Sequence, residues 1–156
     1  MIKKIVKLKV NGDFYEVIVK PNMTLLELLR EGLGFTGTKK GCNEGECGSC
    51  TVILEGKPVN SCMVLGLEAD GKEVITIEGL AKGDELHPLQ KAFIDNAAIQ
   101  CGFCTPGMIL SAKALMDNDS NPTDTEIKEA IAGNICRCTG YISIVEAIKV
   151  VRDQRK

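Results

Sequence analysis

The sequence predicts an α+β fold in two domains, a strand-rich one over residues 1–79 and a helical one over residues 80–156. Three observations favour this division. Apolar residues alternate singly in the first half and recur at helical intervals in the second. The stretch over residues 80–86 mixes glycine and charge without any period, which is typical of a link between domains. The eight cysteines fall into two sets with different spacings, one set in each half.

Alternation and turn residues predict the strands of the first half. Over residues 3–20, apolar residues alternate on either side of Asn11-Gly12, a pair that tolerates the positive φ angles of a tight hairpin turn. Two further runs, 51–54 and 59–62, flank a second turn, and residues 74–77 offer one more β-branched run. The first half therefore begins with a β-hairpin and continues with shorter strands.

Capping residues predict where the helices begin. Thr24 and Glu27 have capping-box spacing, and leucines follow at helical intervals until Gly32 can end the turn. Beyond the domain boundary, Pro88 can open a helix at its first position. We expect four helices there: residues 89–98, residues 108–116, one beginning at Thr123 and one beginning at Ser143, the last two with capping-box spacing. Four such helices make a small bundle.

Composition and charge exclude several classes of function. With 44% hydrophobic and 26% charged residues, the chain has the composition of a globular protein. Nineteen basic and 21 acidic residues give a formal net charge of -2 without a basic stripe, so we expect no nucleic acid partner. The N-terminal segment alternates too quickly to supply an unbroken apolar stretch. We therefore expect no membrane insertion and a cytoplasmic location, where clustered thiols indicate metal or redox chemistry.

The first cysteine set lies in a glycine-rich loop over residues 34–50. Cys42, Cys47 and Cys50 follow the C-x4-C-x2-C spacing of plant-type 2Fe-2S ligation, and Cys62 can supply the fourth thiolate. The glycines let the backbone curl closely enough for N–H groups to point at sulfur. The alternative is a structural zinc site, although four-cysteine zinc sites more often use paired C-x2-C knuckles.

The second cysteine set is ambiguous by spacing alone. Cys101 and Cys104 form a C-x2-C pair, and Cys136 and Cys138 form a C-x-C pair. This pattern leaves zinc open beside an iron-sulfur site. A thioredoxin-like motif would need a strand-helix context that is missing here. The single histidine, His87, lies between the halves, and we interpret it as solvated or as a helix cap rather than as a ligand.

Three motifs occur together and in order: GCNEGECGSCTV at 41–52, QCGFCTPGM at 100–108 and GNICRCTGY at 133–141. With them, nearly the whole chain resembles the iron-sulfur small subunit of the xanthine dehydrogenase and molybdenum hydroxylase family. The resemblance implies a plant-type ferredoxin-like (β-grasp) 2Fe-2S domain followed by a four-helix 2Fe-2S domain. It also implies the ligands of the two clusters: Cys42, Cys47, Cys50 and Cys62 for the first, and Cys101, Cys104, Cys136 and Cys138 for the second.

The resemblance further implies a function. The chain would be a non-catalytic electron-transfer subunit that relays electrons through two 2Fe-2S clusters. These electrons would pass between the molybdenum cofactor of a large subunit and the FAD of a medium subunit, in a dimer of heterotrimers. In relatives the helical-domain cluster lies beside the pterin of the molybdenum cofactor, so the matching residues Gln100 and Cys138 are candidate contacts to that pterin.

Several alternatives stay open from the sequence. Arg137, between two cysteines, either offsets thiolate charge or reaches solvent or a partner, and we expect Tyr141 to pack rather than to carry electrons. Two functions compete with this one: a free-standing ferredoxin-like electron carrier, and an interaction module stabilised by structural zinc. Nothing in the sequence selects the substrate of such a complex.

Overall fold

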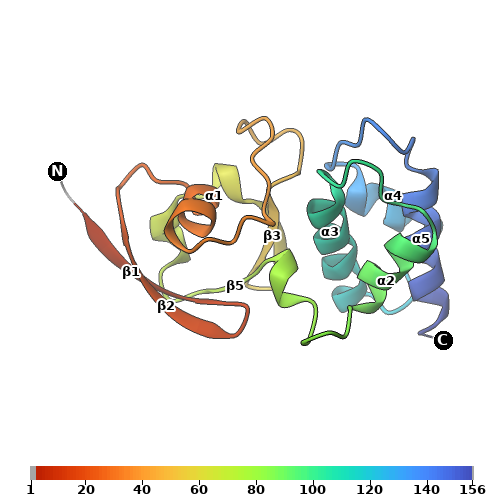
Figure 1. The fold of residues 1–156 in the computed structure, drawn as a ribbon, viewed down its shortest axis with the longest axis horizontal. Helices are drawn as coiled ribbons and strands as arrows, with labels where there is room; N and C mark the ends of the chain where they lie inside the picture. Colours follow the sequence, from red (N-terminus) through yellow and green to blue (C-terminus); the bar gives the residue numbers. More distant parts are fainter. Residues whose placement is uncertain (1–2, 156) are drawn as a thin grey trace.

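The computed structural model describes residues 3–155, and its strands and its four C-terminal helices lie at opposite ends of the long axis of the molecule (Figure 1). A mixed five-stranded sheet with strand order β2-β1-β5-β3-β4 lies toward the N-terminal end. The strands are β1 Lys4–Val10, β2 Asp13–Val19, β3 Thr51–Leu54, β4 Lys57–Asn60 and β5 Glu73–Ile75. β1 and β5 pair in parallel, and the other pairs are antiparallel. With the helices described below, this sheet confirms the predicted α+β fold class.

Both tight turns of the sheet have the backbone geometry that a two-residue hairpin requires. Asn11 (φ 55°) and Gly12 (φ 97°) join β1 to β2, as their sequence predicts. Glu55 (φ 49°) and Gly56 (φ 77°) join β3 to β4 in the same way. The twist of these turns matches the twist of the strands, so each turn sets the register of its hairpin.

The strand predicted over residues 59–62 is wrong in its bounds. β4 begins directly after the turn and ends at Asn60, because Asn60 pairs with Thr51, the first residue of β3, and no strand remains to pair beyond that point. The chain then turns through a short 3-10 helix, η2 Ser61–Met63. Cys62 therefore lies outside the sheet. The remaining short helices are η3 Gly66–Ala69 and η4 Ile77–Gly79, and η4 shortens the strand predicted over residues 74–77.

A short helical segment packs on the N-terminal hairpin. α1 Leu25–Glu27 continues into a π-helical turn, η1 Leu28–Gly32. The predicted capping box is present, because Thr24 Oγ1 accepts from the Glu27 amide at 3.2 Å and the Glu27 carboxylate accepts from the Thr24 amide at 3.0 Å. Buried apolar side chains join this segment to β1: Leu25, Leu28, Leu29, Val6, Leu8 and Val10.

The C-terminal half contains the four predicted helices, although the first ends at residue 95 rather than 98 and the second spans 105–118 rather than 108–116. They are α2 Pro88–Asp95, α3 Thr105–Asn118, α4 Asp124–Ile131 and α5 Ile142–Asp153. His87 caps α2, because its Nδ1 accepts from the Leu89 amide at 3.2 Å, and Thr123 caps α4 through the predicted capping box with Glu126. The cap interpretation of His87 is confirmed.

The predicted start of the last helix is wrong. α5 begins at Ile142 rather than at a cap on Ser143, and Tyr141 precedes it with a left-handed backbone (φ 68°). Tyr141 Oη accepts from the Cys136 amide at 2.9 Å, and the Tyr141 amide donates to Thr139 Oγ1 at 3.2 Å. These contacts within the preceding loop fix the direction of the chain before the helix starts, so Ser143 lies inside the first turn.

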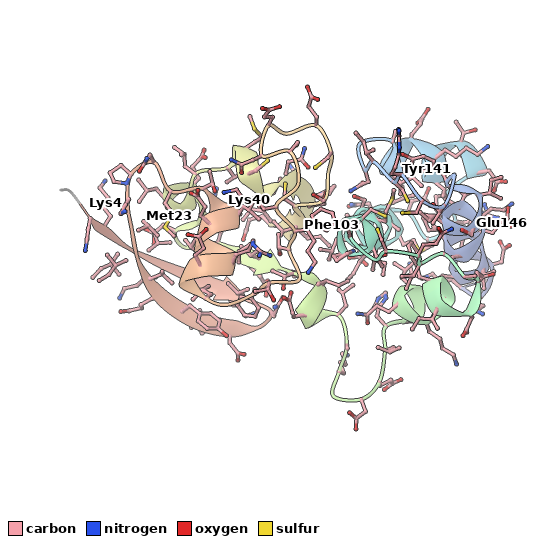
Figure 2. The ribbon with its side chains drawn as sticks, turned by 45° about the horizontal axis from the view of Figure 1, so that its top comes forward. Lys4, Met23, Lys40, Phe103, Tyr141 and Glu146 are labelled. Atoms are coloured by element: carbon pink, nitrogen blue, oxygen red, sulfur yellow. The ribbon has the colours of Figure 1, made fainter. Side chains whose placement is uncertain are left out.

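The two halves meet where α3 packs against β3. Ile53 of β3 is buried in the apolar core of the helical half, and Ile75 and Ile77 pack against the same core. Figure 2 places Phe103, from the turn before α3, at this junction, and its ring lies 3.6 Å from the position that a Cβ on Gly41 would take. We propose residues 1–79 and 80–156 as the two domains, each with its own core and with Ile53 shared across the boundary.

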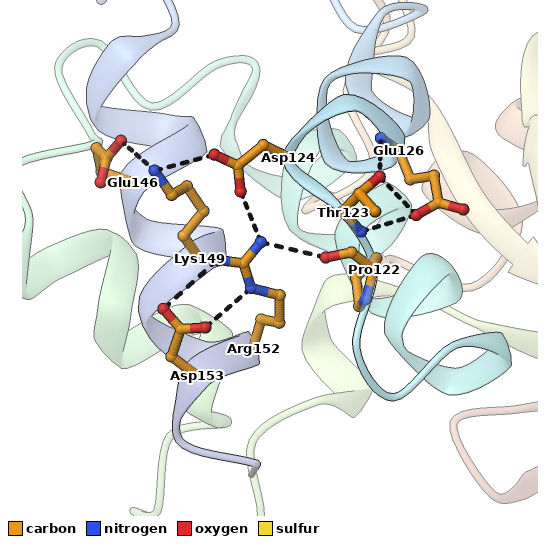
Figure 3. A network of polar contacts seen from close by, with 8 residues as sticks. All are labelled: Pro122, Thr123, Asp124, Glu126, Glu146, Lys149, Arg152 and Asp153. Atoms are coloured by element: carbon orange, nitrogen blue, oxygen red, sulfur yellow. Dashed lines mark hydrogen bonds and ion pairs between the residues drawn. The ribbon is translucent and has the colours of Figure 1, made fainter.

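Ion pairs tie α5 to the start of α4 (Figure 3). The Arg152 guanidinium donates to Asp124 Oδ1 at 2.6 Å and to the Pro122 carbonyl at 3.2 Å. Lys149 reaches Asp124 at 3.3 Å and Glu146 at 3.0 Å. These contacts join the two helices without involving any cysteine.

Within residues 3–155, no helix combines the length and the apolar character that a membrane span needs.

Candidate metal centres

The first thiol group lies in the loop before β3 and in the turn after β4. It consists of the four cysteines predicted for the first cluster: Cys42, Cys47, Cys50 and Cys62. Cys42 Sγ accepts from the amides of Glu44 and Cys47, each at 3.4 Å, and the Cys42 amide donates to Cys47 Sγ at 3.3 Å. The thiols of Cys50 and Cys62 contact each other in a small buried cluster. The charge of Cys42 also raises the pKa of Cys62, so the two thiol pairs lie near each other.

Local polarity moves the pKa values of this group in opposite directions. Backbone N–H groups, that of Cys47 above all, lower the pKa of Cys42 to about 7, which favours the thiolate. Burial, together with the neighbouring thiol of Cys50, raises the pKa of Cys62 to about 11. A buried pair of this kind ionises when a cation lies against it, which is the chemistry of a metal-thiolate site.

Gly41 lies so close to the first thiol group that no larger residue fits. A Cβ on Gly41 would lie 2.5 Å from Ser49 Oγ and 2.7 Å from Cys47 Sγ. Ser49 Oγ in turn lies 3.1 Å from Cys47 Sγ, at hydrogen-bond distance. Gly41 and the Ser49 hydroxyl therefore both lie close against the Cys47 sulfur, which explains the glycine at position 41.

The second thiol group lies between the start of α3 and the loop before α5. It consists of the four cysteines predicted for the second cluster: Cys101, Cys104, Cys136 and Cys138. The thiols contact each other in pairs, Cys104 with Cys136 and Cys101 with Cys138. Cys136 is buried and Cys101 and Cys138 are exposed. The group therefore reaches from the bundle interior to the surface.

Hydrogen bonds and burial also separate the pKa values of the second group. Thr139 lies against Cys136 Sγ, with its hydroxyl at 3.1 Å and its amide at 3.5 Å. Burial raises the pKa of Cys136, but these hydrogen bonds outweigh burial and lower it to about 7. Burial and the contact with Cys136 raise the pKa of Cys104 to about 12. Each group thus holds one thiol that ionises readily and one that resists ionisation without a cation.

The donor set and its arrangement fit a diiron core. Such a core carries two thiolates on each iron, and the sulfurs are presented in pairs in both groups. No three His, Cys, Asp or Glu side chains in the described part of the chain are arranged to hold a single ion. The hydroxyl of Thr105, next to Cys104, is buried and has no hydrogen-bond partner within residues 3–155. A cluster sulfide beside Cys104 would give this hydroxyl an acceptor.

The remaining predicted residues lie around the second group. Gln100 and Cys138 are both exposed, and the Cys138 thiol contacts Cys101, the neighbour of Gln100. Their contact with a pterin stays a prediction. Arg137 is exposed, and Tyr141 packs against the helical core while its hydroxyl serves the Cys136 amide.

Sequence reasoning missed three polar side chains that make hydrogen-bond contacts with the two cysteine loops. Ser49 and Thr139 each approach a cysteine sulfur, and buried Asn134 connects the loops. All three lie inside the motifs at 41–52 and 133–141. A hydroxyl two or three positions after a cysteine of a predicted cluster was the available signal for the first two.

Fold and thiol groups together define an iron-sulfur protein with two cluster-binding domains. Residues 8–81 match the family described as "2Fe-2S iron-sulfur cluster binding domain", and residues 76–149 match the family described as "2Fe-2S binding domain". The two matches share residues 76–81, which lie between the last strand of the sheet and the first helix of the bundle.

Known proteins resemble the chain over most of its length. The nicotinate dehydrogenase small FeS subunit of Eubacterium barkeri is 50% identical over 149 residues, covering 96% of this chain and 95% of the relative. A probable xanthine dehydrogenase subunit of Bacillus subtilis is 44% identical, covering 94% and 84%. In the crystal structure of quinoline 2-oxidoreductase from Pseudomonas putida 86, a chain 41% identical superposes with a TM-score of 0.94, covering 98% and 96%. The protein therefore belongs to the iron-sulfur small subunits of the xanthine dehydrogenase and molybdenum hydroxylase family.

Proposed function

We propose that the chain relays electrons through two 2Fe-2S clusters, from a molybdenum cofactor in a large partner subunit to FAD in a medium one. The observation that carries this proposal is the presence of two groups of four cysteines, one in each of the two cluster-binding domains. A chain with a single group could accept electrons, whereas two groups side by side in one chain suit a relay.

The eight cysteines would hold the clusters, four to each. When bound, a 2Fe-2S cluster supplies a centre that gains and loses one electron at a time. The protein's contribution is to set how readily each centre accepts that electron. The amide groups of Glu44 and Cys47 on Cys42, and the hydroxyl and amide of Thr139 on Cys136, would stabilise negative charge on sulfur and so raise the reduction potential of a bound cluster.

Surface exposure supports an order of the two thiol groups along the relay. Cys101 and Cys138 are exposed, and we propose that the molybdenum subunit docks over them, with Gln100 and Cys138 against its pterin. Apolar side chains near these cysteines are open to a partner: Ile99, Phe103, Ile135 and Ile142. The first group would then pass electrons toward the FAD subunit, and two such heterotrimers would pair.

We also propose a cytoplasmic location. A compartment in which cellular reductants keep thiols from forming disulfides suits a chain whose eight cysteines would all hold clusters.

Purification of the tagged chain from its own cells tests the partners. We expect two larger chains to copurify, one with bound molybdenum and one with FAD, and the isolated small chain to oxidise no substrate. Recovery of the chain alone, with both clusters loaded and reducible, would instead identify a free-standing carrier. Identification of the large chain would also reveal the substrate of the complex, because the pocket of that chain selects the substrate.

A further inference from the structure

A single backbone hydrogen bond connects the two thiol groups. The Ile135 amide donates to the Cys47 carbonyl oxygen at 2.9 Å. Cys47 belongs to the first group, and Ile135 is covalently bonded to Cys136 of the second. A short path of covalent bonds and this hydrogen bond therefore connects Cys47 Sγ to Cys136 Sγ.

The side chain of Asn134 holds this connection in place. Its Nδ2 donates to the Gly48 carbonyl at 2.9 Å and to Thr51 Oγ1 at 3.2 Å, both in the first domain. Its Oδ1 accepts from Ser111 Oγ of α3 at 2.8 Å. Asn134 is 4% exposed, so water does not compete with these bonds, and leaving either donor unpaired would be costly.

Two glycines make room for the Asn134 amide. A Cβ on Gly48 (φ 67°) would lie 2.7 Å from Asn134 Nδ2 and would overlap the carbonyl oxygen of Gly133. A Cβ on Gly107, in the first turn of α3, would lie 2.9 Å from the same nitrogen. The backbone thus leaves a space that fits one planar amide, which lies against Gly48, the residue after Cys47, and two positions before Cys136.

We propose that Asn134 is a positioning residue for electron transfer between the two clusters. It keeps the Ile135 amide on the Cys47 carbonyl and so fixes both the separation and the electronic coupling of the two centres. This inference rests on the proposed function. One electron leaves one cluster and enters the other, so that oxidation balances reduction, and no bond breaks and no proton moves.

The test compares Asn134→Asp with Ser111→Ala in the full, iron-loaded chain. Aspartate keeps the shape of asparagine but places an oxygen against the Gly48 carbonyl and Thr51, so both donors are lost. Ser111→Ala removes only the contact from α3 and leaves both donors in place. Three quantities are measured for each chain: iron content, hydrogen exchange of the Ile135 amide, and the magnetic splitting between the two reduced clusters by electron paramagnetic resonance.

We expect Asn134→Asp to retain both clusters while its Ile135 amide exchanges about tenfold faster, as the loss of a buried hydrogen-bond pair implies. Its magnetic splitting should change, because the loops no longer hold a fixed separation. Ser111→Ala leaves Asn134 Oδ1 without its donor but keeps both Nδ2 hydrogen bonds, so it should retain both clusters and the magnetic splitting, with a much smaller increase in Ile135 exchange.

Unaltered exchange and splitting in Asn134→Asp would overturn the inference. Loss of either cluster from this variant would also overturn it, since Asn134 would then be needed to hold a cluster rather than to connect two. Absence of iron from the unchanged chain contradicts the proposed function instead, and the iron measurement keeps the two failures apart.

Discussion

Gly48 lies with a left-handed backbone (φ 67°) directly against the second cysteine loop, where a Cβ would overlap the Gly133 carbonyl. Gly56 has a similar backbone (φ 77°), but a Cβ there would meet nothing within 4 Å. We predict that Gly48→Ala lowers the free energy of unfolding by about 3 kcal/mol, whereas Gly56→Ala costs only about 1–2 kcal/mol for the backbone. Urea denaturation midpoints of the two variants measure the difference. Equal midpoints would mean that the two loops separate at no cost.

Single residues also show how far the sequence predicts the site. The eight cysteines and their division into two groups follow from spacing and resemblance, because ligand spacing is local. Asn134 could not be found in this way. Its partners Gly48 and Thr51 lie 86 and 83 positions away in the chain, and only the packing of α3 on β3 brings them together.

At the scale of elements, helix caps give a matched pair of variants. Thr123 caps α4 with its side chain, whereas Ser143 has the same spacing to Glu146 but lies inside the first turn of α5. We predict that Thr123→Ala lowers the free energy of unfolding by about 1 kcal/mol and Ser143→Ala by less than about 0.5 kcal/mol. Thermal melts of both variants check this. A larger loss of unfolding free energy for Ser143→Ala would indicate that Ser143 caps α5, as its spacing to Glu146 predicts.

The ion pairs between α4 and α5 predict a pH dependence. Hydrogen bonds from Arg152 and then Lys149 hold the pKa of Asp124 below its ordinary value of 3.8. Because the folded pKa is the lower one, the pair stabilises the fold above pH 3.8, and this stabilisation is lost as the pH falls through the folded pKa.

Asp124→Asn should therefore lower the melting temperature at neutral pH, with a difference that vanishes in acid. Glu146→Gln is the control, because it removes one contact of Lys149 and leaves the Asp124–Arg152 pair intact. Melting temperatures of the variants and the unchanged chain, measured from neutral pH down to below pH 3.8, test whether the Asp124→Asn difference shrinks in acid. A difference that grows in acid would contradict it.

Elements with local signals were predicted well, and those set by distant contacts were not. The Asn11-Gly12 hairpin and the Thr24 and Thr123 caps depend on neighbouring residues alone. The end of β4 depends on where its partner begins, and the start of α5 depends on how Tyr141 is held by the cysteine loop. Local sequence carries neither piece of information.

At the scale of the whole molecule, the two halves are joined through their cysteine loops. Helix α3, which begins directly after Cys104, packs on strand β3, which begins directly after Cys50. The Cys47–Ile135 hydrogen bond lies at the same junction. Each half has its own apolar core. Loss of one cluster should therefore leave the other domain folded and able to bind its cluster.

Metal and sulfide analysis of the chain and of Cys138→Ser tests this central claim most directly. The unchanged chain should be brown, with about four irons and four acid-labile sulfides per chain and two reducible centres. Cys138→Ser should keep about two irons and the plant-type centre of the first domain. A colourless chain with about two zinc ions, or a variant that loses both centres or neither, would contradict the account.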